Sequence, residues 1–196
     1  MKVSIIMPVY NLPELTKRAL ESIPFDEDLE VVVVDDCSDL ETKKVLEEFK
    51  DKIKLFTNKK NKGNGYSRSL AIDNCAGDYI IGLDNDDYFY TDEFRKALKQ
   101  LDGTDLVFIN QRINDGYVFN LCEENKQHYC AFWSKFVKRE LIGDIRPKHD
   151  NYKNDYFFTQ ELLKKPHTEK YTGIVAYHYN FPRENSILWN KDHGIC

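Results

Sequence analysis

The sequence predicts an α/β protein with a mostly parallel central sheet covered by helices on both faces. Along the first half of the chain, apolar runs typical of strands alternate with amphipathic stretches typical of helices. One apolar run, Val31 to Val34, consists of four consecutive valines, as in a strand that is buried on both faces. Strand and helix alternate three times before a fourth strand, and this order is typical of parallel sheets with crossover helices.

The first strand is expected at Val3 to Met7, a short apolar run that Pro8 ends. The first helix is expected at Leu12 to Ile23, because the apolar residues of this stretch recur on one helical face. Pro13 suits the first turn of the helix, where a missing backbone N–H costs no hydrogen bond.

The second strand is the valine run, and a second helix is expected at Leu40 to Phe49, with Ser38 or Asp39 as its N-cap. The remaining elements of this half are a strand, a helix and a strand, at Ile53 to Thr57, Tyr66 to Cys75 and Tyr79 to Leu83.

The second half of the chain is less regular. A helix is expected at Asp92 to Leu101, with Thr91 as its cap. Leu106 to Gln111 and Tyr117 to Leu121 are expected to form a hairpin around the turn Asn114-Asp115-Gly116. The last elements are a helix that Pro166 ends and a late strand, at Asp155 to Leu163 and Thr172 to Tyr179.

The length of 196 residues fits one domain of ordinary size. The chain shows no internal repeat, no low-complexity tract and no linker rich in proline and glycine. Because the regular pattern changes near residue 110, we expect a single domain over 1–196 with two functional halves, 1–110 and 111–196. This length leaves no room for added membrane helices.

Charge and hydropathy exclude several classes of protein. The 28 Lys and Arg against 33 Asp and Glu give a formal net charge of −5, which disfavours nucleic acid as a partner. No apolar run approaches the ~20 residues of a membrane-spanning helix, and the N-terminal segment is too short for a signal peptide. We therefore expect a cytoplasmic protein without a transmembrane segment. The basic run Asn58 to Lys62 is interpreted as a solvated loop, with a place near anionic lipid or the diphosphate as the alternative. A peripheral association with the inner membrane face or with a partner protein is left open.

The five cysteines are irregularly spaced and include no Cys-x-x-Cys pair. Free thiols in a reducing cytosol are the favoured interpretation. A zinc site at Cys122 and Cys130, with His128 between them, is the less favoured alternative.

Two acidic clusters come directly after predicted strands. Asp35 and Asp36 follow the valine run, and Asp84-Asn85-Asp86-Asp87 follows Tyr79 to Leu83. Because ligands of such sheets bind beyond the carboxyl ends of the strands, we expect these carboxylates to face one cleft. Carboxylates this close repel one another unless a cation or hydrogen-bond donors neutralise them. Mg²⁺ or Mn²⁺, held by one or two carboxylates and by substrate phosphates, fits this requirement and favours a nucleotide diphosphate as ligand. The alternative is that the acids only cap the helices that follow.

The sequence contains no Walker-type phosphate loop. Gly63-Asn64-Gly65 is too short for a dinucleotide fingerprint, and we interpret it as a tight entry into the third helix. Arg68 of that helix would then face the same cleft.

Several motifs occur in the order and spacing of family 2 glycosyltransferases, and the chain resembles short bacterial members over nearly its whole length. The motifs are Pro8-Val9-Tyr10-Asn11, Val34 to Asp39, Asn61-Lys62-Gly63 with Arg68, Gly77 to Ile80 leading to Leu83 to Asp87, Phe132 to Lys135 with Lys138-Arg139, Asn154-Asp155, and Tyr177-His178-Tyr179 through Ser186.

The resemblance implies a GT-A fold and an inverting, metal-dependent enzyme. Such an enzyme transfers a sugar from a nucleotide-sugar, with UDP as the expected nucleotide, to a glycan, lipid-linked or protein acceptor in cell-surface polysaccharide or glycoconjugate synthesis. On the donor side, the resemblance implies that Pro8, Val9 and Tyr10 line the pocket for base and ribose, with Asp35 and Asp36 near the base. Arg68 would lie near the base or the diphosphate. Asp84, with Asn85 beside it, would approach the ribose or a metal-bound water, and Asp86 would be the ligand of Mn²⁺ or Mg²⁺.

On the acceptor side, Asp155 matches the carboxylate that deprotonates the acceptor hydroxyl. The alternative for Asp155 is an acid that only stabilises a helix N-terminus. Trp133 is our candidate for stacking on the acceptor sugar, while most other aromatic residues of this half are interpreted as core.

Two positions depart from the family pattern. Asn154 precedes Asp155, where members usually carry Glu, and a late His is replaced by Arg183, which we expect at the diphosphate. His178 is the nearest His and is interpreted as packed. These departures favour the alternative of a non-catalytic GT-A module that binds nucleotide or glycan. A nucleotidyltransferase is disfavoured, because no Gly-rich basic loop follows the first strand.

Overall fold

The computed structural model describes residues 1–114, 116–125, 130–147 and 153–181, and the elements below belong to these residues. The elements, in chain order, are β1 (Val3–Val9), α1 (Pro13–Glu21), β2 (Leu29–Asp35), α2 (Leu40–Glu48), β3 (Lys54–Thr57), α3 (Asn64–Asp73), β4 (Tyr79–Gly82), β5 (Tyr88–Phe89), α4 (Thr91–Leu98), β6 (Leu106–Ile113), β7 (Val118–Phe119), the 3₁₀ turn η1 (Phe132–Ser134), β8 (Lys135–Lys138), α5 (Arg139–Ile142), α6 (Asn154–Leu163) and β9 (Glu169–Tyr179).

The described strands form a single sheet in the order β3-β2-β1-β4-β8-β6-β9-β5, with β7 paired to β6. The four strands of the first half are parallel to one another, as the alternation of strands and helices predicts. Beyond them the sheet is mixed, because β8 is antiparallel to both β4 and β6, while β9 is parallel to β6 and antiparallel to β5. The predicted α/β architecture is confirmed, with the parallel part confined to the first half.

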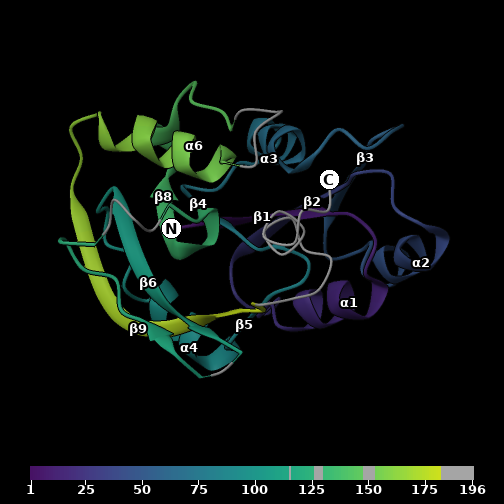
Figure 1. Cartoon of the computed structure of the whole chain (residues 1–196), viewed down its shortest axis with the longest axis horizontal. Helices are drawn as coiled ribbons and strands as arrows, with labels where there is room; N and C mark the ends of the chain where they lie inside the picture. The colour runs from purple at the N-terminus through teal and green to yellow at the C-terminus, as the bar shows by residue number, and fades with distance from the viewer. Residues whose placement is uncertain (115, 126–129, 148–152, 182–196) are drawn as a thin grey trace, which may run out of the picture.

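Helices cover both faces of the sheet (Figure 1). One face packs against α1, α2 and α4, and the core there includes Leu20, Leu46, Phe94 and Val33. The other face packs against α3 and α6, and that core includes Val32, Val34, Ala71, Phe158 and Leu162. Because the valines of β2 face the two cores alternately and are at most 3% exposed, the strand is buried on both sides as its sequence predicts.

Pro8 does not end the first strand, which continues to Val9. The backbone nitrogens of Ile6 and Pro8 lie on the same side of the strand, and the Ile6 carbonyl accepts from the Leu83 N–H, just past the end of β4. At Pro8 the neighbour on that side has therefore ended, and the missing N–H of proline costs no ladder hydrogen bond.

The predicted helices and strands are otherwise confirmed, apart from shifts of a few residues at their ends. Asp39 is the N-cap of α2, and its carboxylate accepts from the Thr42 N–H at 2.8 Å. Thr91 as a cap is wrong, since α4 begins at Thr91 itself and the Thr91 hydroxyl donates to the Ser22 carbonyl. The sequence patterns did not predict β5, η1, β8 or α5.

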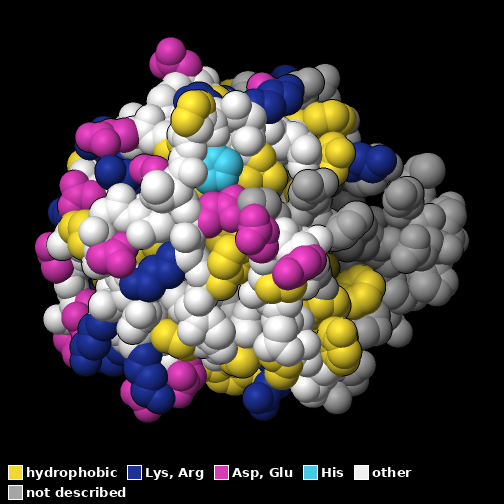
Figure 2. Space-filling model, turned by 90° about the vertical axis from the view of Figure 1, so that its left-hand side faces the viewer, with side chains coloured by type: hydrophobic (Ala, Val, Ile, Leu, Met, Phe, Trp, Pro, Cys, Tyr) yellow, Lys and Arg dark blue, Asp and Glu magenta, His cyan; other side chains and the backbone are white. Residues whose placement is uncertain are grey.

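Within the described part of the chain, no helix is long and apolar enough to cross a membrane. Figure 2 shows one face of the molecule, on which basic, acidic and apolar side chains are interspersed without one continuous basic area.

Candidate active site

The loops after β1 and β4 meet at the carboxyl edge of the parallel strands. The Asn85 side-chain amide, in the loop after β4, donates to the Asn11 carbonyl at 2.9 Å and to the Thr16 hydroxyl at 3.0 Å. These bonds fix the loop of Asp84 to Asp87 against the segment that leaves β1. Of the predicted donor-pocket residues on that segment, Pro8 and Val9 are buried in the sheet, whereas Tyr10 is 49% exposed. Tyr10 is thus the one of the three whose side chain is open to a ligand.

Asp35 and Asp36 organise loops at the end of β2. Asp36 is 3% exposed, and its carboxylate accepts from the Asn58 side chain at 2.7 Å and from the backbone N–H groups of Lys62 and Gly63 at 2.9 and 2.7 Å. Asp35 accepts from the Ser38 N–H at 2.8 Å. These backbone and amide donors neutralise both carboxylates without a cation, and their place beside the base of a nucleotide stays a prediction.

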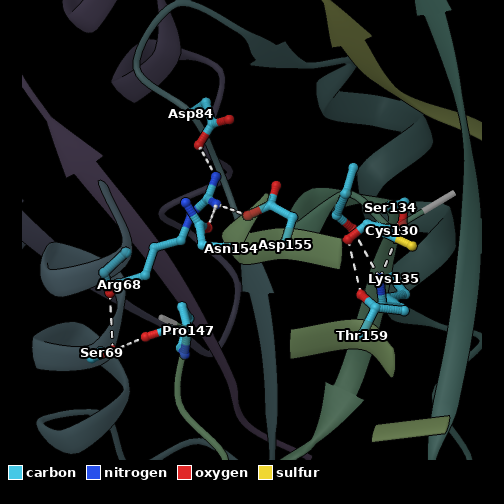
Figure 3. A network of polar contacts seen from close by, with 12 residues as sticks. Arg68, Ser69, Asp84, Cys130, Ser134, Lys135, Pro147, Asn154, Asp155 and Thr159 are labelled. Carbon is cyan, nitrogen blue, oxygen red and sulfur yellow. Dashed lines mark hydrogen bonds and ion pairs between the residues drawn. The ribbon is translucent and has the colours of Figure 1, made fainter. Parts of the chain in front are cut away.

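Arg68 lies between Asp84 and Asp155 (Figure 3). Its guanidinium is 1% exposed and donates to Asp84 at 2.6 Å, to Asn154 at 3.0 Å and to Asp155. The guanidinium also lies over the Phe132 ring, 5.3 Å from its centroid. One buried cation therefore connects α3, the loop after β4 and the start of α6.

Asp155 is the second residue of α6 and its side chain is 28% exposed. Burial raises the pKa of this carboxyl above its ordinary value, as does the nearby charge of Asp84, while Arg68 and Lys135 act in the opposite direction. A carboxylate with a raised pKa, held in a fixed place and partly open to solvent, is suited to accept a proton.

The loop after β4 rests on Tyr177 of β9. The Tyr177 hydroxyl donates to the Asp87 carboxylate at 2.6 Å and accepts from the Asp84 N–H at 3.2 Å. Asp87 is 1% exposed, and its pKa is raised well above the ordinary value by burial and by the charges of Asp86 and Asp84. Tyr177 belongs to the late motif, but its contact with Asp87 could not be predicted from local sequence, because the two residues lie 90 positions apart in the chain.

Trp133 lies beneath the same loop. Its ring stacks on Tyr177 with centroids 4.4 Å apart and an interplanar angle of 5°, and it is 4% exposed. Contact of Trp133 with an acceptor stays a prediction, and the position of the ring shows a structural part in supporting Tyr177. Arg183 and Ser186 lie outside the described residues.

His178 is packed in an aromatic stack at the edge of the sheet, in agreement with its interpretation from the sequence. Its ring stacks on Tyr88 with centroids 4.3 Å apart, and its two nitrogens lie 3.0 Å from the Tyr90 hydroxyl and 2.9 Å from the Asn114 side-chain oxygen.

The residues present fit a divalent metal that arrives with a phosphate ligand rather than a metal cage. Among the described residues, no group of three or more His, Cys, Asp or Glu side chains is arranged to hold a metal ion. Asp84 and Asp87 are hydrogen-bonded to Arg68 and Tyr177, and Asp86 is half-buried between them. One carboxylate completed by phosphate oxygens is a usual magnesium or manganese environment. The cysteines of the described chain are free thiols, and His128 of the alternative zinc site lies outside it.

Comparison with known proteins finds the same family that the motifs suggest. The profile of glycosyl transferase family 2 matches residues 4–174. The chain is 30% identical to the poly(ribitol-phosphate) β-N-acetylglucosaminyltransferase TarS of Staphylococcus aureus, over 96% of this chain and 37% of TarS. It is 32% identical to the GalNAc(5)-diNAcBac-PP-undecaprenol β-1,3-glucosyltransferase of Campylobacter jejuni, over 97% of this chain and 62% of that protein. The chain thus spans less than two thirds of the length of these relatives.

Solved structures show the same fold. TarS residues 1–349 in complex with UDP-GlcNAc superpose with a TM-score of 0.82 at 24% identity, over 95% of this chain and 60% of that one. The mannosyltransferase PcManGT of Pyrobaculum calidifontis, in complex with GDP-Man and Mn²⁺, superposes with a TM-score of 0.74 at 19% identity, over 96% of this chain and 59% of that one. The predicted GT-A fold is confirmed.

Proposed function

The chain belongs to glycosyl transferase family 2, and on this premise we propose that it transfers a sugar from a nucleotide-sugar to an acceptor hydroxyl, with inversion at the anomeric carbon. The observation that carries the proposal is the position of Asp155. This carboxylate stands at the start of α6, 28% exposed, and is joined through Arg68 to Asp84 on the donor-side loop. A proton acceptor of the acceptor half is thereby held against the loop proposed to bind the donor.

UDP is the proposed nucleotide, with Tyr10 beside its base or ribose and Asp84 and Asn85 on the donor side. The UDP-GlcNAc complex of TarS supports a UDP-sugar, and the fixed geometry of the Asn85 amide supports a rigid donor loop. Pro8 and Val9 shape this pocket through the backbone. Asp35 and Asp36 hold the neighbouring loops in place, and Arg183 is proposed to contact the diphosphate.

Asp86 is the proposed protein ligand of Mn²⁺ or Mg²⁺, and the Mn²⁺ in the PcManGT complex supports a divalent ion. When bound, such an ion offsets the charge that develops on the leaving diphosphate. The protein's own part is to hold Asp86 beside the donor, through the Asn85 bonds on one side and Tyr177 on the other.

Asp155 is the proposed general base. A sugar hydroxyl is a poor nucleophile, and a positioned carboxylate that takes its proton as the new bond forms contributes about 10²–10⁴-fold. Arg68 orients this carboxylate, and the N-terminus of α6 favours its charged form before proton transfer. Attack by the activated hydroxyl opposite the leaving diphosphate gives inversion.

The proposed acceptor is a glycan or a lipid-linked glycan of the cell surface. The names of the two relatives describe transfer to poly(ribitol-phosphate) and to an undecaprenol-linked glycan, which supports a glycan or lipid-linked acceptor of the cell surface. A protein acceptor remains an alternative, and Trp133 is proposed at the acceptor side. We propose a cytoplasmic location, with peripheral contact to the inner membrane face or to a partner protein.

The test is release of UDP from a panel of UDP-sugars with Mn²⁺ and a glycan acceptor. Asp155→Asn is expected to lower kcat by about 10²-fold or more, and Asp86→Ala to remove the stimulation by metal. Asp144→Asn is the control, because Asp144 is exposed and outside the site, and it should leave turnover unchanged. A product that retains the anomeric configuration of the donor would contradict the role of Asp155.

A second candidate is a non-catalytic module that binds nucleotide or glycan. Asn154 favours it, because an amide takes the place of a second carboxylate beside the proposed base and is bonded to Arg68. Calorimetry distinguishes the two functions, since tight Mn²⁺-dependent UDP binding without turnover on any donor supports the module.

A further inference from the structure

Lys135 is a buried cation on the acceptor side of the site. It is the first residue of β8, where it is paired with Phe108 of β6, and it is 1% exposed. Its face of the sheet is the one covered by α6, the helix that begins at Asn154 and carries Asp155. Figure 3 shows its ammonium beneath the Cys130 to Ser134 turn, behind Asp155 as seen from Arg68.

The contacts of this ammonium are all to neutral groups. It donates to the Ala131 carbonyl at 2.9 Å and lies 3.4 Å from the Ser134 hydroxyl. Within the described chain it forms no ion pair with a carboxylate, in contrast to Arg68. Burial of an unpaired charge is costly, so a hydrophobic residue of this length would be the cheaper occupant for folding alone.

Lys135 adds a second positive charge near the pair of carboxylates that Arg68 joins (Figure 3). Two carboxylates, Asp84 and Asp155, share the single guanidinium of Arg68. Asn154, the other partner of Arg68, carries no charge. Arg68 and Lys135 together supply two positive charges for these two negative ones. Without Lys135, one carboxylate of the cluster would be unbalanced in a largely desolvated place.

We propose that Lys135 is a positioning residue for the reaction. Its charge stabilises the ionised, proton-accepting form of Asp155 from the side opposite Arg68 (Figure 3). The inference rests on the proposed function, because it gives Lys135 a part in the chemistry assigned to Asp155. The directions in which two pKa values are shifted agree with this role of Lys135. Burial lowers the pKa of Lys135 to about 8, and the charge of Lys135 acts to lower the pKa of Asp155.

The segment before β8 contacts both Lys135 and the helix α6 that carries Asp155. The Ala131 carbonyl accepts a hydrogen bond from the Lys135 ammonium and another, at 2.7 Å, from the Ser134 hydroxyl. The neighbouring Cys130 carbonyl accepts from Thr159, one turn along α6 from Asp155, at 2.9 Å. The same short turn therefore contacts both the cation and the helix that carries the base.

The groups that face Asp155 come from several elements, and the test has to separate Lys135 from the rest. They are Arg68 on α3, Asp84 after β4, Cys130 before η1, Lys135 on β8 and Tyr179 on β9. Replacement of Lys135 leaves the bonds of Arg68 to Asp84 and Asp155 in place.

The first experiment needs no substrate. The carboxyl carbon of Asp155 is followed by NMR during a pH titration of the protein labelled with ¹³C-aspartate, with Asp155→Asn to assign the signal. Lys135→Met is expected to raise the pKa of Asp155 by about one unit. Lys164→Met is the control, because Lys164 follows the other end of α6 and its side chain is 68% exposed, and it should leave the titration unchanged. An Asp155 titration that is the same in Lys135→Met and the native protein overturns the proposal.

The second experiment is the pH profile of kcat/KM with the UDP-sugar that the donor panel identifies. Lys135→Met is expected to shift the acidic limb upward by about one unit, which is roughly a tenfold loss below that limb, and to lose much less at higher pH. A loss equal at every pH indicates a merely structural role and overturns the proposal. If the native protein shows no turnover while the NMR shift is found, the function proposed above fails and the charge coupling stands.

Lys135→Gln is made beside Lys135→Met, since either substitution can disturb packing. The proposal requires that at least one of the two folds with native stability or better at pH 7, because among the described residues the buried ammonium has no ion pair to lose. Two variants that both fail to fold would show that Lys135 serves the fold, and would overturn the assignment.

Discussion

Replacement of Glu30 by Gln tests a buried carboxylate that joins the parallel strands, outside the active site. Glu30 lies in β2, and its carboxylate accepts from the Ser4 hydroxyl and the Ala76 N–H at 2.6 Å each, and from the Lys54 ammonium at 2.8 Å. These bonds connect β1, β2, β3 and the segment before β4. A glutamine side chain cannot accept all three hydrogen bonds, because its NH₂ group donates and only its carbonyl oxygen accepts.

The magnitude follows from the pKa of Glu30. Burial alone would raise the pKa, but the hydrogen bonds from Lys54, Ser4 and Ala76 lower it to about 2, from a model-compound value of 4.5. A difference of 2.5 units corresponds to roughly 3 kcal/mol, which we reduce to about 2 kcal/mol because the Lys54 side chain is 53% exposed. Since the pKa is lower in the folded state, this stabilisation is present above pH 4.5 and is lost as pH falls towards 2.

The assay is urea unfolding followed by tryptophan fluorescence, at pH 7 and in steps down to the pH at which the native protein unfolds. Glu30→Gln should lower the free energy of unfolding by about 2 kcal/mol at pH 7, with a Tm lower by roughly 4–8 °C, and the difference should shrink below pH 4.5. Glu48→Gln is the matched control, because the Glu48–Lys17 pair joins two side chains about half exposed, and it should cost under about 0.5 kcal/mol. Equal losses in the two variants, or a difference that does not depend on pH, would refute the reasoning.

Three further substitutions test other parts of the fold by the same unfolding assay. Tyr177→Phe removes the hydroxyl that bonds Asp87 at 2.6 Å and should cost about 2 kcal/mol, with a higher KM for donor; an unchanged KM would contradict the role of Tyr177 under the donor loop. Gly82→Ala should cost about 1–3 kcal/mol, because an added Cβ would lie 2.8 Å from the Phe132 ring and 3.3 Å from its backbone; native stability would show that the ring can move away. Asp39→Ala removes the cap of α2 and should cost about 1 kcal/mol, whereas Asp39→Asn should restore most of it.

The first half of the fold could be predicted because each element there follows one simple pattern. The valines of β2 are buried on both faces, and α1 presents Thr16, Ala19 and Leu20 to the core at helical spacing. The second half breaks these patterns. In β8, the inward residue Lys135 interrupts the alternation that would reveal a strand, and β5 has only two residues, Tyr88 and Phe89. Such elements are fixed by long-range pairing, which local sequence does not report.

The site could be predicted as a set of residues but not as a set of contacts. The acidic runs and Arg68 were identified from their positions after strands and on a helix. The bonds of Arg68 to Asp84, 16 residues away, and to Asp155, 87 residues away, depend on how α6 packs against α3. No spacing in the sequence predicts that packing, and the contact of Tyr177 with Asp87 was missed for the same reason.

Hydrogen bonds and an ion pair within the protein neutralise most of the acidic side chains at the site, which weakens the argument that their repulsion requires a metal. Five carboxylates at the carboxyl edge of the parallel strands predict a shared cation from the sequence, yet contacts within the protein neutralise most of them. Asp35 and Asp36 receive N–H donors, and Asp84 receives Arg68. Asp87, almost fully buried, receives the Tyr177 hydroxyl and has a raised pKa, so that it resists ionisation where it lies. Repulsion among the acids therefore does not by itself require a metal in the unliganded protein. We propose that Asp86, the acid that matches the metal ligand of the family motif, shares the metal with phosphate oxygens that the donor brings, so metal affinity should rise when UDP is present.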